Sequence, residues 1–166
     1  FSGSFRENLS NPAWIGETPR QQANGLSNPD QLNRTHEATF GGPIVRDRLW
    51  FFSAGRYENA ATPNTFTQTG GSYLRTITNR RGEVKLTGTV APAQSLQATY
   101  INNATEQANT SGLPATVLVD ASTLYARQLP NHLFVVNYAG VLPARTLATL
   151  QYSHKQDGRR NNGGRS

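Results

Sequence analysis

Among the titratable side chains of this sequence, three histidines and one turn carboxylate are the first to weigh as candidates for metal binding or proton transfer. His36, His132 and His154 lie far apart along the chain, and none has a second ligand at the spacing of a metal-binding motif. Asp47 lies between two arginines, which could place an acid in a cationic pocket. A solvated turn explains the same residues. We therefore expect polar side chains at these positions rather than a metal site.

The sequence also has no recognisable nucleophile or phosphate-binding loop. Serine, histidine and aspartate all occur, but no serine stands in a Gly-x-Ser-x-Gly elbow. Gly70-Gly71 and Gly163-Gly164 are not followed by the Gly-Lys-Ser/Thr of a phosphate loop. The chain contains zero Cys, which excludes disulfides, thiolate metal sites and a cysteine nucleophile. The sequence thus predicts neither an enzyme nor a cofactor.

Aromatic and cationic residues occur together in the long stretches that we expect to be loops. This mixture suits an anionic or sugar-like ligand, although solvated loop residues explain any single one of them more simply. The ligand-binding candidates in these expected loops are Trp14, Arg20, Tyr73, Arg75, Tyr125 and Arg127.

Alternation of apolar and polar residues predicts the strands that must position these side chains. The clearest run sets Val84, Leu86 and Val90 on one side and Glu83 and Lys85 on the other. Similar runs predict strands at residues 1–6, 37–45, 49–58, 80–90, 96–100, 132–141 and 148–153. Tight breaks are expected at residues 46–48, 91–94 and 142–145, and long loops at residues 8–35, 59–78 and 102–130, the last with a short ordered piece near 117–124.

Long and short connections therefore alternate, and the strands are close to the roughly nine to eleven residues that a tilted strand needs to cross a bilayer. Short turns at one rim and long loops at the other are typical of outer-membrane barrels. A soluble sandwich has no reason to keep this alternation, because both of its ends face water. We therefore expect an all-β, antiparallel up-and-down transmembrane β-barrel, here an incomplete wall of about seven strands with short periplasmic turns and long extracellular loops.

Composition is consistent with this interpretation. The 166 residues have a formal charge of +6, and their arginines are scattered rather than gathered in one stripe, so nucleic acid is not an expected partner. The mean hydropathy is -0.58, and no apolar run approaches the length of a membrane-spanning helix. Zero Met and a start within a strand favour a piece of a longer protein.

The cost of charge in lipid predicts which side chains face inward. Arg or Lys on the lipid face near the bilayer midplane costs about 2–4 kcal/mol, so charged strand positions should face the lumen or lie near a rim. The lumen-facing candidates are Glu37, Thr39, Arg56, Glu58, Glu83, Lys85 and Asn137. In the strand at 49–58, Leu49, Phe51, Gly55 and Tyr57 then point outward. Trp50 and Phe52 point inward near the short-turn rim, where a plug domain would fill the lumen.

Residues 41–52 (Gly-Gly-Pro-Ile-Val-Arg-Asp-Arg-Leu-Trp-Phe-Phe) resemble a hairpin of the TonB-dependent receptors of the outer membrane, in particular the Oar-like branch. The similarity continues through Leu86-Thr87-Gly88, Leu129-Pro130-Asn131 and Asn137-Tyr138. The resemblance implies a barrel of about twenty-two strands around its own plug domain. It also implies a Gram-negative outer membrane and its lipid as surroundings, an unknown ligand captured at the extracellular loops, and energy from a TonB–ExbB–ExbD complex. Neither a plug nor a TonB box occurs in this sequence.

One alternative of a different class remains open. The same strands could form a soluble or cell-surface β-sandwich that binds carbohydrate or protein through its loops. The outward face of the sheet distinguishes the barrel hypothesis from the sandwich hypothesis. A sandwich should fold alone in water, whereas a barrel wall should aggregate unless detergent is supplied.

Overall fold

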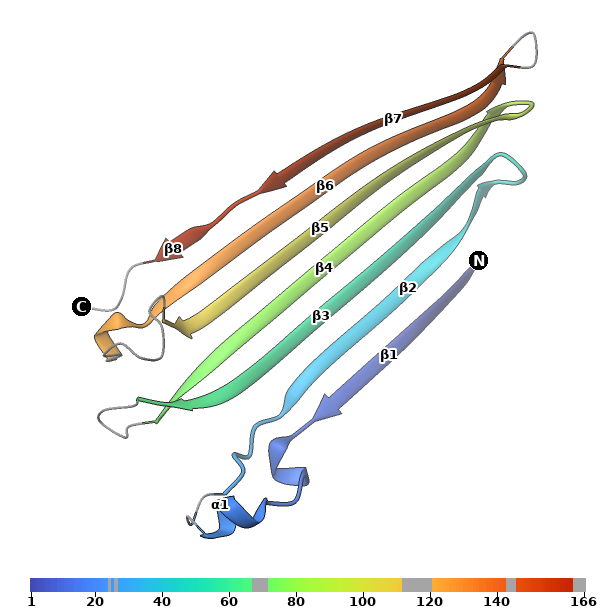
Figure 1. Cartoon of the computed structure of the whole chain (residues 1–166). Helices are drawn as coiled ribbons and strands as arrows, with labels where there is room; N and C mark the ends of the chain where they lie inside the picture. The colour runs from blue at the N-terminus through green and yellow to red at the C-terminus, as the bar shows by residue number, and fades with distance from the viewer. Residues whose placement is uncertain (24, 26, 67–71, 112–120, 143–145, 163–166) are drawn as a thin grey trace.

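The computed structural model describes residues 1–23, 25, 27–66, 72–111, 121–142 and 146–162. Within these ranges the chain forms one antiparallel sheet in which each strand from β1 to β7 pairs with the next along the chain (Figure 1). Its strands are β1 (Ser2–Ser10), β2 (Asn33–Val45), β3 (Leu49–Thr65), β4 (Ser72–Ala91), β5 (Gln94–Thr110), β6 (Tyr125–Leu142), β7 (Thr146–Asp157) and β8 (Arg160–Asn162). The expected all-β, up-and-down arrangement is confirmed, and the described sheet is open, with β1 at one edge.

Short helical pieces lie between the strands. The 3-10 turn η1 (Pro12–Trp14) and the helix α1 (Pro19–Ala23) follow β1, and a second 3-10 turn, η2 (Ala121–Thr123), precedes β6. The last one falls within the ordered piece expected near 117–124, whose first residues lie outside the described ranges. No helix among the described residues is long and apolar enough to cross a membrane.

The strands are longer than the sequence predicted. β3, β4, β5 and β6 contain 17, 20, 17 and 18 residues, so the expected length of about nine to eleven is wrong for them. Strand β3 continues to Thr65 and β4 begins at Ser72, both within the expected loop at 59–78. In the same way β5 continues to Thr110 and β6 begins at Tyr125, within the expected loop at 102–130. The expected loop at 8–35 is entered by β1, which continues to Ser10, and by β2, which begins at Asn33.

Cross-strand polar contacts explain why these extensions form without an alternating pattern. Asn59 Nδ2 donates to Thr78 Oγ1 at 3.1 Å, joining β3 to β4. Asn109 Nδ2 donates to the carbonyl oxygen of Leu74 at 2.8 Å, joining β5 to β4. Ladder hydrogen bonds and such pairs stabilise a strand that has polar residues on both faces, whereas apolar periodicity reports only a strand with one apolar face.

Strand β8 was also not expected, because its residues belong to a tail rich in Gly, Asn and Arg. It continues the line of β7 and pairs with β6, placing Arg160 opposite Gln128. Just before it, the Gly158 N–H donates to the Pro130 carbonyl at 2.9 Å. The polar end of β6 therefore keeps a hydrogen-bonded neighbour beyond Asp157.

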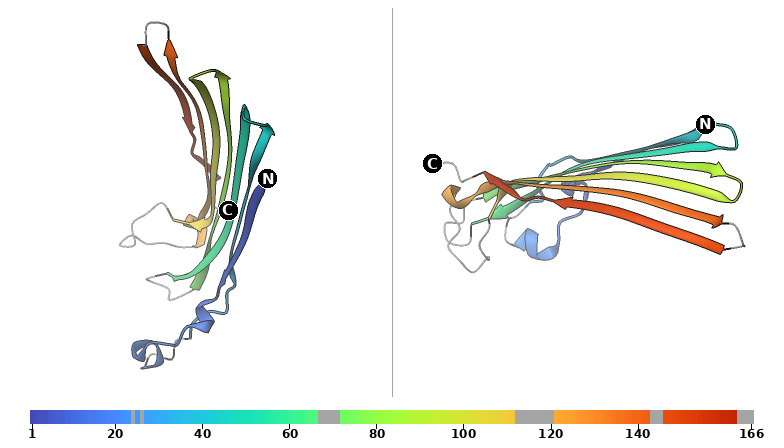
Figure 2. Two further views of the ribbon diagram at one scale, coloured as in Figure 1. Left: turned by 90° about the vertical axis from the view of Figure 1, so that its right-hand side faces the viewer. Right: turned by 90° about the horizontal axis from the view of Figure 1, so that it is seen from above.

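The sheet is a single curved layer (Figure 2). Among the described residues the most buried apolar side chains are Ala61 and Phe66, which are 4% and 8% exposed, and no large side chain is fully buried. A sheet normally buries its apolar face against a second layer of helices or strands. The described residues form no second layer over the sheet, so the apolar side chains of this sheet remain exposed.

Register divides the side chains into two faces, because residues directly opposite on neighbouring strands share a face. What we call the polar face carries a row that crosses the sheet from β1 to β7: Arg6, Glu37, Arg56, Arg81, Asn103, Asn131 and Asp157. The opposite side, the apolar face, carries the row Gly42, Phe51, Leu86, Ala98, Val136 and Tyr152.

The two kinds of connection lie at opposite ends of the strands (Figure 1). The tight breaks at 46–48 and 92–93 join β2 to β3 and β4 to β5, as predicted. Asp47 and Ala93 each have a φ of 59° there, the left-handed region that a tight turn requires. The expected break at 142–145 joins β6 to β7, and residues 143–145 of it lie outside the described ranges.

Candidate functional site

Four charged side chains form the centre of the polar face. Glu37 on β2 lies between two arginines: its carboxylate is 3.9 Å from Arg6 Nη1 on β1 and 3.6 Å from Arg56 Nε on β3. Arg56 Nη2 is in turn 3.4 Å from Glu58 Oε2 on the same strand. The alternating charges follow from register, which sets Arg6 opposite Glu37 and Glu37 opposite Arg56.

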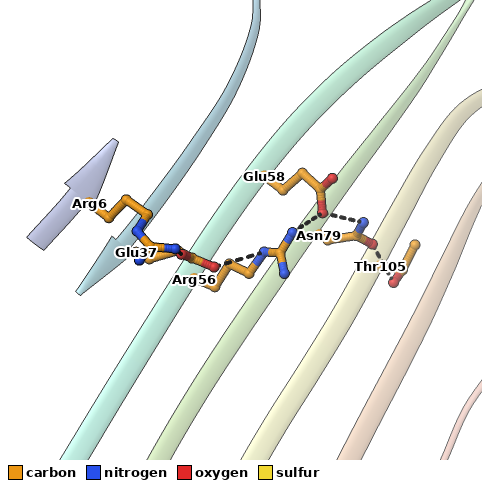
Figure 3. A network of polar contacts seen from close by, with 6 residues as sticks. All are labelled: Arg6, Glu37, Arg56, Glu58, Asn79 and Thr105. Carbon is orange, nitrogen blue, oxygen red and sulfur yellow. Dashed lines mark hydrogen bonds and ion pairs between the residues drawn. The ribbon is translucent and has the colours of Figure 1, made fainter. Parts of the chain in front are cut away.

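Neutral side chains continue this network toward β5 (Figure 3). Asn79 Nδ2 on β4 donates to Glu58 Oε2 at 3.2 Å, and Thr105 Oγ1 on β5 donates to Asn79 Oδ1 at 2.8 Å. Five neighbouring strands are thus linked by side-chain contacts on one face. Because these side chains are partly solvated, each ion pair is worth about 0–1 kcal/mol, and the network orients side chains more than it stabilises the sheet.

The network lies beside two adjoining shallow depressions that share Arg56 and Arg81. The first is lined on the polar face by Ser4, Arg6, Glu37, Thr39, Phe52 and Glu83. Arg81 Nη2 contacts Glu83 Oε2 at 3.1 Å, so the acids of this depression are neutralised by arginines. The surface suits hydration and polar contact.

The structure brings all seven lumen-facing candidates to the polar face. Glu37, Thr39, Arg56 and Glu58 lie there on β2 and β3, Glu83 and Lys85 on β4, and Asn137 on β6. Trp50 and Phe52 share this face, opposite Thr87 and Lys85 of β4. They are 37% and 40% exposed, so two aromatic rings are exposed close to a short turn, on a mostly polar face that also carries Ile101, Leu133 and Val135.

The ligand-binding candidates are positioned differently from the prediction. Tyr73 and Arg75 lie on β4, and Tyr125 and Arg127 lie on β6, so the expectation that they occupy loops is wrong. These strands continue past the apolar region and carry the four residues with them. Trp14 lies in η1 and is 66% exposed. Arg20 lies in α1, where only the backbone is described.

The long connection that carries Trp14 is organised by one asparagine. Asn11 is 7% exposed, and its Nδ2 donates to Asp30 Oδ1 at 2.6 Å. Its Oδ1 accepts from the backbone N–H groups of Ala13 and Gln31 at 3.0 and 3.1 Å. This N-cap arrangement starts η1 and joins the two ends of the connection, which presents Trp14 outward.

Several residues of the polar face were missed by sequence reasoning. Arg6, Asn79 and Thr105 join the network and Arg81 pairs with Glu83 beside it, but all four lie in stretches that we expected to be loops or strand ends. Extending the two-residue alternation of β4 backward from Glu83 would have reached Arg81 and Asn79 on the correct face.

The apolar face has a charge-free zone. Its Asp, Glu, Lys and Arg residues among those described on the strands are confined to two neighbouring rows near the long connections: Glu7, Arg34, Arg80, Glu106 and Arg160. Between these rows and the short turns the face presents large exposed side chains, including Phe5, Phe40, Val84, Leu86, Leu96, Tyr100, Phe134, Leu150 and Tyr152.

Two histidines, His36 and His132, lie at the border of this zone and pair with tyrosines, whereas His154 lies within the zone opposite Phe134. Tyr100 Oη and His132 Nδ1 are 3.0 Å apart, and the rings of His36 and Tyr57 are stacked with centroids 6.2 Å apart. Among the described residues no group of His, Asp and Glu has the arrangement of a metal site. The border therefore consists of rings with an apolar body and a polar edge.

Comparison of this chain with protein-family models, with curated proteins and with solved structures gave no match. What can be said of its role rests on the two faces of the sheet and on the resemblance of the hairpin at 41–52.

Proposed function

We propose that this chain is part of the wall of an outer-membrane β-barrel receptor of the TonB-dependent type, in the Oar-like branch. In this proposal the apolar face contacts lipid, and the polar face lines the lumen. The long connections face the outside of the cell and receive a ligand, which passes through the plugged barrel with energy supplied by a TonB–ExbB–ExbD complex.

The observation that carries this proposal is the charge-free zone of the apolar face. On β4 this zone lies between Arg80, the last charged residue of the face, and Val90 near the short turn, a separation of ten residues. At about 3.3 Å per residue this separation spans about 33 Å of strand. A strand tilted by about 40° then covers about 25 Å along the membrane normal, the height of the apolar band of outer-membrane barrels.

Exposure supports the same assignment. Phe40, Val84 and Leu150 are 49%, 48% and 70% exposed, and they belong to one continuous face. Contiguous apolar surface of this extent marks a partner or a membrane rather than water. A β-sandwich, the alternative from the sequence, would need a second sheet over this face, and the described residues form only one layer.

The sheet edges fit a piece of a closed barrel. Backbone groups on an unpaired edge would be unsatisfied in lipid, at several kcal/mol for each group. The edge strand β1 is flanked on one side only. We therefore infer that further strands of the natural protein pair with the free edges and close the wall.

The exposed aromatic pair on the polar face has a role in this proposal. Trp50 and Phe52 face the lumen near the short turns, where they contact the protein's own plug domain. Lys85 and Glu83 beside them offer polar contacts to the same plug surface. The centre of the polar face is lined by the paired charges of Glu37, Arg56 and Glu58, which suits a hydrated lumen.

Cell fractionation tests this proposal. The full-length natural protein should separate with outer membranes and migrate faster on a denaturing gel before boiling than after, because folded outer-membrane barrels resist the detergent. A known periplasmic protein serves as the control for contamination. Recovery of the protein from the soluble periplasm would contradict the proposal.

A further inference from the structure

Three polar atoms at the long-connection end of the polar face have no hydrogen-bond partner. They are Arg75 Nε on β4, Gln107 Oε1 on β5 and Arg127 Nε on β6, and each atom is buried. A buried polar atom without a partner costs about 1–3 kcal/mol, so such groups normally have a function or a missing partner. Three of them together point to a ligand.

Register brings the three side chains to one place. Gln107 is directly opposite Arg127 on one side and Ile77 on the other, and Arg75 lies two residues beyond Ile77 on the same face of β4. Two strand spacings of about 4.8 Å and two residues of about 3.3 Å put the backbones of the two arginines about 12 Å apart. Both guanidinium groups can therefore reach one anion above Gln107.

No carboxylate neutralises these arginines among the described residues. The acids of the central network, Glu37 and Glu58, both pair with Arg56, and Glu83 beside them pairs with Arg81. Glu106, the acid next to Gln107 in sequence, lies on the opposite face and pairs with Arg80 at 3.4 Å. The guanidinium groups of Arg75 and Arg127 thus carry uncompensated positive charge on a partly buried surface.

Aromatic rings lie beside both arginines. Arg127 Cζ is 5.2 Å from the centroid of the Tyr125 ring, and Arg127 Nη2 donates to Tyr125 Oη. On β4, the Tyr73 ring stacks on Phe66 with centroids 4.5 Å apart. Each tyrosine precedes its arginine by two residues and so shares its face of the strand.

We propose that Arg75 and Arg127 bind the oxyanion of a small ring-containing ligand, a carboxylate or a phosphate ester. Guanidinium groups bind both oxyanions through paired hydrogen bonds, which supplies partners for the free donors. Gln107 Oε1 accepts from a hydroxyl of the ligand, and Tyr73 and Tyr125 flank its ring. The inference rests on the proposed receptor function only in identifying this ligand with the transported one.

Binding of defined probes to the full-length protein in detergent tests the site. Phenyl phosphate and benzoate should bind, and benzyl alcohol, which has the ring without the anion, should bind at least tenfold more weakly in a calorimetric titration. Arg75→Gln and Arg127→Gln should each weaken phenyl phosphate binding at least tenfold. The matched control Arg81→Gln removes an arginine of the same face that is paired with Glu83, and it should change the affinity less than twofold.

Two further variants keep the test decisive if a glutamine variant fails to fold. Arg127→Lys retains the charge without the planar fork and should bind with an intermediate affinity. Gln107→Glu places a carboxylate between the arginines and should abolish preference for the anionic probes. Equal affinities of all variants, or equal binding of the anionic and neutral probes, would overturn the proposed site.

The outcome separates this site from the receptor function. A protein that fractionates with outer membranes but binds the probes without dependence on Arg75 and Arg127 would remove the anion site alone. A soluble protein whose binding depends on both arginines would remove the receptor function and leave the anion site.

Discussion

Adjacent residues on β6 allow the two faces to be compared directly. Val136 belongs to the middle of the apolar face, between Ala98 and Tyr152, whereas Asn137 belongs to the polar face, between Gln97 and Gln151. If the apolar face contacts lipid, Val136→Arg puts a charge near the bilayer midplane. On the same assignment, Asn137→Arg puts the same charge among neutral polar side chains that would line the lumen.

The expected magnitudes differ strongly. Arg near the midplane of the lipid face costs about 2–4 kcal/mol. Taking about 3 kcal/mol, Val136→Arg should lower the ratio of folded to unfolded protein by about a hundredfold, since about 1.4 kcal/mol corresponds to tenfold. Asn137→Arg should stay within about 0.5 kcal/mol of the natural protein. Guanidinium unfolding of the full-length protein in lipid vesicles, followed by heat-modifiable migration, measures both.

A third substitution tests the dependence on depth. Thr78 lies on the apolar face opposite Glu106, in one of the two charged rows. An arginine there should cost only about 0–1 kcal/mol, because the cost falls toward the membrane interface. Equal destabilisation by Val136→Arg and Asn137→Arg, or a larger effect of Asn137→Arg, would refute the assignment of the faces.

The turns, the network and the orientation give further predictions. Ala93→Gly should raise stability by about 0.5–1 kcal/mol, because the left-handed backbone costs Ala about 1–2 kcal/mol and the greater freedom of glycine in the unfolded chain offsets part of this gain. Asp47→Gly, at the same φ of 59°, is the control and should raise stability less, since Asp tolerates this backbone region better than Ala. Equal gains of the two variants in chemical denaturation would contradict the reasoning. Glu37→Gln should lower stability by less than about 1 kcal/mol, because its ion pairs are partly solvated, and a loss above about 2 kcal/mol in the same assay would mean that the network stabilises the sheet. A cysteine at Asp47 should resist a membrane-impermeant maleimide in intact cells while one at Trp14 reacts, and labelling at Asp47 would show that the orientation is reversed.

The central part of the sheet could be predicted from the sequence because one of its faces is apolar. Alternation around Leu86 set the face of each residue of β4 from 80 to 90, and the tight break at Asp47 set the pairing of β2 with β3. Those two facts do not fix the register, because pairing centred on Asp47 would set Glu37 opposite Tyr57. An irregularity between Pro43 and Val45 shifts the pairing by one residue, so that Glu37 lies opposite Arg56. The composition of the polar face was therefore accessible from the sequence, whereas its exact pairing was not.

The strand extensions could not be predicted in the same way. Along Ile77, Thr78 and Asn79 both faces carry polar or mixed residues, so no period marks the strand, and its pairing depends on partners far away in the sequence. For this reason Arg75 and Arg127 were expected in loops. Their proximity across Gln107 depends on the register of three strands, which sequence spacing alone does not give.

The central claim concerns which face of the sheet contacts lipid, and spin labels along β6 test it most directly. The chain has zero Cys, so single cysteines at each position from 133 to 138 can be labelled selectively in the full-length protein in vesicles. Relaxation by oxygen reports lipid exposure, and relaxation by a water-soluble nickel complex reports exposure to water. We predict that labels at the even positions, on the face of Phe134 and Val136, respond to oxygen and that those at the odd positions respond to nickel. Nickel accessibility at every position, or a loss of the two-residue alternation, would contradict the account.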